Sequence, residues 1–161
     1  MPATHLITGR LGSGKTRTIE QLIATEKLTH GPAVTVWGIE TAAPGRLTGL
    51  DRTADADQAV QLLTKASALA GRRFAHAHQR EYEPSAAEPR LLLVIDDAEP
   101  LLADTEAAGL LQFLAVIGRK SGVETVLAAT DTRLNVWPPA LLRRFTSDIV
   151  TQLPSRPRIQ D

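Results

Sequence analysis

A glycine-rich segment near the N-terminus has the residue types and spacing of an anion-binding loop. Residues 9–16 read Gly-Arg-Leu-Gly-Ser-Gly-Lys-Thr and match the pattern G-x-x-x-x-G-K-[ST]. Glycines let the backbone curl so that successive N–H groups point at phosphate oxygens, and the N-terminus of a following helix adds partial positive charge. The segment therefore predicts a phosphate-binding P-loop.

Two side chains of this loop have specific predicted roles. We expect the Lys15 ammonium group to contact the β and γ phosphates of ATP and the Thr16 hydroxyl group to ligate Mg²⁺. A strand-like segment precedes the loop and a helix-like segment follows it, which argues against an accidental glycine-rich turn. The predicted nucleotide-binding residues are Gly9, Arg10, Leu11, Gly12, Ser13, Gly14, Lys15, Thr16 and Arg17.

Two carboxylates follow the most apolar run of the chain. Residues 91–95 read Leu-Leu-Leu-Val-Ile and lead directly into Asp96 and Asp97. Parallel sheets bind ligands at the carboxyl ends of their strands, so Asp96 is predicted to hold Mg²⁺ through a coordinated water. Asp97 is the candidate general base, with a helix-capping or loop carboxylate as the alternative interpretation. Glu99 is a weaker substitute for the base.

Two further places carry polar residues suited to phosphate chemistry. Thr130 and Asp131 follow the next predicted strand, where a polar sensor of the γ-phosphate is expected. The predicted catalytic residues are Lys15, Asp97, Thr130 and Asp131. Arg143 and Arg144 are either a solvated helix end or an arginine finger that acts on the nucleotide of a neighbouring subunit.

Apolar periodicity predicts strands that alternate with helices along the chain. The predicted strands are residues 5–8, 33–39, 91–95, 124–130 and 147–153. The predicted helices occupy 15–29, a stretch around 59–69, a stretch around 110–117, and 138–144. This alternation predicts an α/β fold, a three-layer α/β/α sandwich with a mainly parallel central sheet.

Local signals predict several of the helix ends. Gly31-Pro32 and Gly122 are expected to terminate the helices before them, and Asp55 with Gln58 forms a candidate capping box. Residues 83–89 contain two prolines and are expected to form a loop. We expect one ATPase domain over residues 1–153, followed by a flexible C-terminal tail over 154–161.

Composition excludes several classes of function. The 161 residues include 18 basic and 18 acidic side chains, so no overall positive charge favours DNA binding. The chain has no cysteine, which rules out disulfides and thiolate chemistry, and it has no apolar run of membrane-spanning length. A cytoplasmic protein is expected. His76 and His78 are predicted surface residues, while Trp37 and Trp137 are predicted packing residues.

The order of these motifs resembles the FtsK/SpoIIIE family of DNA translocases and its relatives in actinobacterial conjugation and secretion systems. The resemblance covers roughly residues 5–153 and is carried by GRLGSGKT, AVTVWGIE, GLDRTADADQAVQLLTKASALAGRR, LLLVIDDAEPLL and IGRKSGVETVLAATDTR. It implies a RecA/FtsK-like P-loop NTPase that works as a ring with ATP between subunits. It also implies a homo-oligomer or a larger motor partner, with double-stranded DNA as a candidate partner.

Three positions depart from the family pattern. Asp97 stands where relatives usually have glutamate, Asp131 where they have glutamine, and residues 40–43 where they commonly carry aspartate-x-lysine-glycine. The leading hypothesis is a Mg²⁺-dependent ATPase that powers translocation of DNA or protein. The alternatives are a nucleotide-gated regulatory or assembly subunit with weak hydrolysis, and an AAA+ ATPase, which the Asp-Asp pair and the segment PPALLRRF resemble. A kinase ranks last because no acceptor-binding motif is present.

Overall fold

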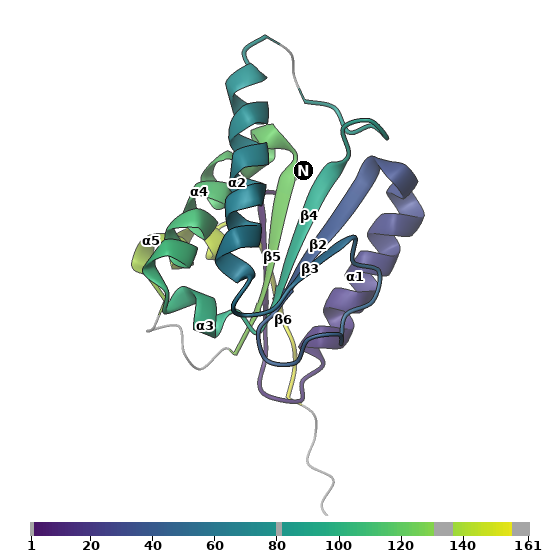
Figure 1. Cartoon of the computed structure of the whole chain (residues 1–161). Helices are drawn as coiled ribbons and strands as arrows, with labels where there is room; N and C mark the ends of the chain where they lie inside the picture. Colours follow the sequence, from purple (N-terminus) through teal and green to yellow (C-terminus); the bar gives the residue numbers. More distant parts are fainter. Residues whose placement is uncertain (1, 80–81, 131–136, 156–161) are drawn as a thin grey trace, which may run out of the picture.

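The computed structural model describes residues 2–79, 82–130 and 137–155. These residues form a parallel six-stranded sheet in the order β3-β2-β4-β5-β1-β6, with helices on both faces (Figure 1). The predicted three-layer α/β/α sandwich is confirmed. The strands are β1 Thr4–Thr8, β2 Val34–Glu40, β3 Arg52–Ala54, β4 Arg90–Asp96, β5 Val123–Ala129 and β6 Ile149–Gln152.

The helices cover the two faces of the sheet unequally. Helix α1 lies on one face, while α2, α4 and α5 gather on the other (Figure 1). Short α3 connects β4 to α4, and a 3-10 turn, η1, joins α1 to β2. The helices are α1 Lys15–His30, η1 Gly31–Ala33, α2 Ala59–His76, α3 Glu99–Leu102, α4 Thr105–Ser121 and α5 Pro139–Thr146.

Strand β4 is buried on both faces, as its continuous apolar sequence predicts. Successive side chains of a strand point to opposite faces, so Leu92 and Val94 join the core under α1. Leu91, Leu93 and Ile95 join the larger core formed with α2, α4 and α5. This burial fixes the register of β4 and therefore the edge of the sheet at which Asp96 emerges.

The predicted helix ends are confirmed by the backbone. Gly31 follows α1 with φ 51° and Gly122 follows α4 in the left-handed conformation with φ 68°. Asp55 and Gln58 form two reciprocal hydrogen bonds just before α2. The backbone N–H of Asp55 donates to the Gln58 side chain at 3.3 Å, and the backbone N–H of Gln58 donates to the Asp55 carboxylate at 3.0 Å. Asp104 caps α4 by accepting a hydrogen bond from the backbone N–H of Ala107 at 2.9 Å.

Besides the η1 turn, two elements were absent from the sequence prediction. β3 has three residues at an edge of the sheet, and α3 has four residues directly after the Asp-Asp pair. Both are too short to show a hydrophobic period, and each is stabilised by its tertiary contacts. The predicted tail stays a prediction, because its residues 156–161 lie outside the described part of the chain.

A buried ionic cluster occupies the edge of the sheet where β4 and β5 begin. The Arg90 guanidinium is nearly inaccessible and donates to the Glu124 carboxylate at 2.8 Å and to the Glu26 carboxylate of α1. His30 approaches the same Glu26 carboxylate at 3.5 Å. Burial raises the pKa of Glu124, and the charge and hydrogen bond of Arg90 oppose this shift. Arg90 therefore compensates a carboxylate that would otherwise be isolated in the protein interior.

Candidate functional site

The parallel strands bring the P-loop, Asp96 and Thr130 together at the carboxyl-terminal ends of the strands. The P-loop follows β1, Thr130 follows β5, and Asp96 is the last residue of β4. In the sheet register Glu40 of β2 lies opposite Asp96. A cavity of about 460 Å³ opens here, lined by Leu11, Gly12, Gly14, Lys15, Thr16, Arg17, Glu40, Ala42, Ala43, Arg46, Asp96, Asp97 and Thr130.

Two glycines of the P-loop are required by its conformation. Gly14 precedes α1 with φ 98°, a left-handed conformation that other residues adopt only at a cost. At Gly9 an added Cβ atom would lie 2.3 Å from the Ser13 Oγ atom, 3.0 Å from the Ser13 Cβ atom and 3.2 Å from the Leu153 Cβ atom, so a side chain there would require the neighbouring residues to shift. The loop consequently curls tightly onto the first turn of α1, which has no acidic residue. The positive end of the helix dipole therefore faces the cavity without a compensating carboxylate on that turn.

Lys15 lies across the P-loop. Its Nζ atom donates to the carbonyl oxygens of Gly9 at 2.8 Å and Arg10 at 2.9 Å. These bonds hold the ammonium group beside the cavity that the loop encloses. Arg10, Leu11 and Arg17 are exposed, and Leu11 and Arg17 also line the cavity.

Thr16 and Asp96 form the central contact of the site. The Thr16 hydroxyl group donates to the Asp96 carboxylate at 2.8 Å, across 80 positions of sequence. Hydroxyl and carboxylate oxygens are the hard ligands that Mg²⁺ binds. Within the described residues there is no cluster of three or more His, Cys, Asp or Glu side chains that could hold a metal. The donor set fits an ion that keeps waters and phosphate oxygens among its ligands, as Mg²⁺ does.

Asp97 has an unusual backbone and a perturbed carboxyl group. Its φ is 58°, a left-handed conformation that aspartate tolerates better than most residues. Its pKa is raised from 3.8 to about 6, mainly by a shared hydrogen bond with Glu99, then by burial and by the charges of Glu99 and Asp96. The carbonyl oxygen of Asp97 accepts a hydrogen bond from Thr41 at 2.5 Å, which holds the turn.

Glu99 links this turn to the end of β5. One oxygen of its carboxylate accepts a hydrogen bond from the backbone N–H of Thr130. Glu99 therefore contacts Thr130 directly and also raises the pKa of Asp97. The sequence interpretation gave Glu99 only a secondary role. Asp131 lies outside the described residues.

The remaining candidates lie away from the cavity. Arg143 and Arg144 are exposed on α5 and do not line it, so they take no part in the site of their own chain. His76 and His78 are exposed as predicted. Both tryptophans are packing residues: Trp137 packs edge-on against Phe145 at 6.1 Å, and Trp37 lies under the Arg52 guanidinium at 4.7 Å.

Sequence reasoning gave no site role to three polar residues on the β2 side of the cavity. Glu40 and Arg46 line it, and Thr41 bonds to the turn that carries Asp97. A signal was available, because the apolar β2 run ends in polar Glu40-Thr41 much as the β4 run ends in Asp96-Asp97.

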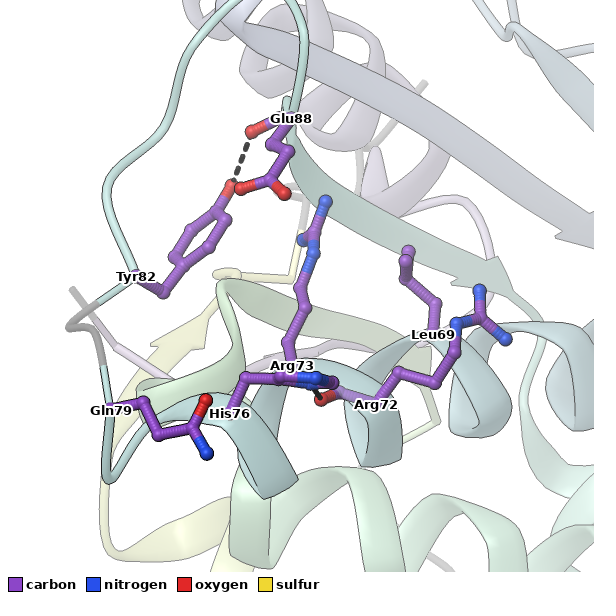
Figure 2. A pocket seen from close by; sticks show the side chains of 7 residues that line it. All are labelled: Leu69, Arg72, Arg73, His76, Gln79, Tyr82 and Glu88. Atoms are coloured by element: carbon purple, nitrogen blue, oxygen red, sulfur yellow. Dashed lines mark hydrogen bonds between the residues drawn. The ribbon is translucent and has the colours of Figure 1, made fainter.

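A second cavity of about 440 Å³ lies at the other end of the strands, near the beginning of β4 (Figure 2). There the Arg73 guanidinium stacks on the Tyr82 ring at 4.5 Å and donates to the carbonyl oxygens of Pro89 and Ser121 at 2.8 and 3.2 Å. Tyr82 in turn donates to the carbonyl oxygen of Glu88 at 2.9 Å (Figure 2). These contacts fasten the segment before β4 to the end of α4, which is a structural role.

The fold and the site together define a P-loop ATPase domain. A family model described as an AAA domain matches residues 3–136, and the chain belongs to this family. The sequence interpretation held an AAA class as the rival family, and the fold neighbours described next confirm its leading resemblance to FtsK/SpoIIIE-type ATPases. No curated protein matches the chain in sequence.

Solved structures share the fold. They include EccC of Thermomonospora curvata (ATPases 2 and 3) in complex with a signal sequence peptide, with 17% identity, TM-score 0.78, and 93% of this chain covered against 31% of that one. The cytoplasmic domain of EssC has 16% identity, TM-score 0.69, and coverages of 95% and 33%. The pCW3 conjugation coupling protein TcpA with ATPγS has 15% identity, TM-score 0.72, and coverages of 89% and 47%.

These neighbours are the secretion and conjugation ATPases that the family resemblance predicts. Identities this low establish similarity of fold alone. The chain spans between about a third and a half of each neighbour's length. Within the described residues, no helix is both long and apolar enough to cross a membrane.

Proposed function

We propose that this domain binds ATP together with Mg²⁺ and hydrolyses it. The observation that carries the proposal is the 2.8 Å hydrogen bond between Thr16 of the P-loop and Asp96 of β4, in the cavity that Lys15 also lines. In this arrangement a phosphate-binding loop and a hard-oxygen donor pair meet at one point. A phosphate chain with its divalent cation satisfies both.

Each residue has a role that follows from its position. The backbone N–H groups of the P-loop and the N-terminus of α1 hold the phosphates, and Lys15 exchanges its loop carbonyls for phosphate oxygens. Thr16 and Asp96 would hold Mg²⁺, which neutralises the charge of the phosphate chain. Thr130, held by Glu99, senses the terminal phosphate, and we assign Asp131 to the same region.

Asp97 is the proposed general base for the attacking water. With a pKa of about 6, its carboxyl group is mostly ionised at neutral pH and can accept a proton. Aspartate is shorter than glutamate, and this carboxyl group is already engaged with Glu99. These two features favour a second candidate function, a nucleotide-gated regulatory or assembly subunit with slow hydrolysis.

We further propose that ATP turnover is coupled to translocation of protein or DNA through an oligomeric ring. The similar folds of secretion and conjugation ATPases support this proposal. Within it, residues 1–153 are the ATPase domain, Arg143 or Arg144 is the finger that reaches a neighbouring subunit, and the domain works in the cytoplasm. Double-stranded DNA is a candidate partner, although the zero formal charge of the chain gives it no general affinity for DNA.

Steady-state and single-turnover ATP hydrolysis test these proposals. We expect Mg²⁺-dependent turnover that is abolished in Lys15→Ala and unchanged in Lys65→Ala, an exposed lysine of α2. Persistent turnover in Lys15→Ala would refute the assignment of the site. ATP binding without single-turnover hydrolysis would favour the nucleotide-gated subunit. Turnover that rises with protein concentration and with double-stranded DNA would support a DNA motor.

A further inference from the structure

The loop that follows β2 forms the second wall of the cavity. Glu40, Ala42, Ala43 and Arg46 line the cavity across from the P-loop residues. Because Glu40 lies opposite Asp96 in the sheet register, this loop starts on the side of the two aspartates. The aspartates mark where the terminal phosphate and its cation would lie. The loop therefore lies near the terminal end of a bound phosphate chain.

A buried carboxylate fixes the shape of this loop. Glu40 is 4% exposed, and its two oxygens accept hydrogen bonds from three consecutive backbone N–H groups. The donors are Gly45 at 2.9 Å, Arg46 at 2.8 Å and Leu47 at 2.7 Å. Gly45 has φ 86°, which permits the tight turn, and Leu47 is anchored in the core under α1. Arg46 is thus held between two anchored residues.

Charge also favours an anion at this wall. The negative charge of Glu40 is compensated by its three N–H donors, so it does not dominate the cavity beside it. Arg46 is exposed, and within the described residues its guanidinium forms no ion pair. A guanidinium group binds phosphate oxygens in a bidentate fashion. Arg46 therefore supplies, in the cavity that Lys15 also lines, a positive charge that forms no ion pair within the described residues.

We propose that Arg46 contacts the terminal phosphate of ATP and that Glu40 is the positioning residue that holds the Arg46 turn in place. This inference rests on the proposed nucleotide-binding function and adds a specificity for triphosphate over diphosphate. Loss of one charge-assisted phosphate contact weakens binding by roughly tenfold or more. That loss applies to ATP and not to ADP, which lacks the phosphate concerned.

Calorimetric titration of the protein with ATPγS and with ADP, both with Mg²⁺, tests the proposal. We expect Arg46→Ala to bind ATPγS roughly tenfold more weakly while ADP affinity changes less than twofold. Arg46→Lys should recover part of the loss, and Arg72→Ala, an exposed arginine at the other end of the strands, should change neither affinity. An unchanged ratio of the two affinities in Arg46→Ala, or an equal loss for both nucleotides, would overturn the proposal.

Glu40→Gln separates positioning from a general loss of structure. If Glu40 acts through Arg46, Glu40→Gln shows the same selective loss for ATPγS, and adding Arg46→Ala to it causes no further loss. Amide hydrogen exchange without nucleotide should be faster at residues 45–47 and unchanged in β4. Additive losses in the double variant, or unchanged exchange at residues 45–47, would refute the role of Glu40.

The Lys15→Ala variant distinguishes this inference from the function on which it rests. Wild-type protein that binds neither nucleotide would contradict both. Wild-type binding that Lys15→Ala abolishes, combined with an unchanged selectivity in Arg46→Ala, would leave the nucleotide site in place and remove only the Arg46 contact.

Discussion

Replacing Arg90 with methionine should destabilise the fold more than any other single change that we predict. The side chain is 7% exposed and contacts the Glu124 side chain, which is 6% exposed, so the substitution leaves a carboxylate buried without its cation. Breaking a buried pair in this way costs about 3 to 5 kcal/mol. For a chain of this size each kcal/mol lowers the Tm by roughly 2 to 4 °C. The Tm of Arg90→Met should therefore fall by roughly 6 to 20 °C.

The pH dependence of this loss has a definite sign. Burial raises the pKa of Glu124 above its ordinary value of 4.5, and removing Arg90 removes the main opposing influence. A carboxyl group with a raised pKa in the folded state binds a proton more readily there than in the unfolded chain. The contribution of this proton binding to the free energy of unfolding is fully present at pH values below 4.5. It is lost as the pH rises through the raised pKa of Glu124. The deficit of Arg90→Met should thus be smaller at pH 5 than at pH 8.

Urea unfolding followed by far-UV circular dichroism measures both effects. Adding Glu124→Gln to Arg90→Met should recover a large part of the loss, because it removes the isolated charge. Arg143→Met, at an exposed arginine, should change the free energy of unfolding by about 0.5 kcal/mol or less. A loss below about 1 kcal/mol in Arg90→Met, or no recovery with Glu124→Gln, would refute this account of the cluster.

Three further predictions concern local backbone geometry. Gly9→Ala should distort the P-loop, because its Cβ would lie 3.0 Å from Ser13 Cβ and 3.2 Å from Leu153 Cβ, contacts that a change of the Ser13 rotamer does not relieve. We expect a stability loss of about 1 to 3 kcal/mol and weaker ATPγS binding, and unchanged binding would contradict the geometry. Asp97→Gly should be about 1 kcal/mol more stable than Asp97→Ala in urea unfolding, because φ is 58°; equal stabilities would argue against that conformation. Asp104→Ala should cost about 1 kcal/mol by removing the cap on the Ala107 N–H, whereas Asp104→Asn should be nearly neutral.

Local sequence predicted most of the elements and much of the site. The spacing of residues 9–16 identifies the P-loop because its conformation depends on glycines at set positions, which are visible without any tertiary information. The apolar run before Asp96 identifies a buried strand for a similar reason, since burial on both faces leaves no polar alternation. The helix ends at Gly31 and Gly122 were also predicted, each from a single glycine.

Only the tertiary structure decided which of these residues meet. Thr16 and Asp96 are 80 positions apart, and they bond because β4 lies two strands from β1, an order that no local pattern encodes. The contacts of Glu40 with residues 45–47, and of Arg90 with Glu124, likewise depend on chain reversal and strand register. Burial then determines the chemistry of these charges, because a carboxylate removed from water must find N–H donors or a cation. The sequence predicted the phosphate-binding loop, and the sheet decided which carboxylates surround it.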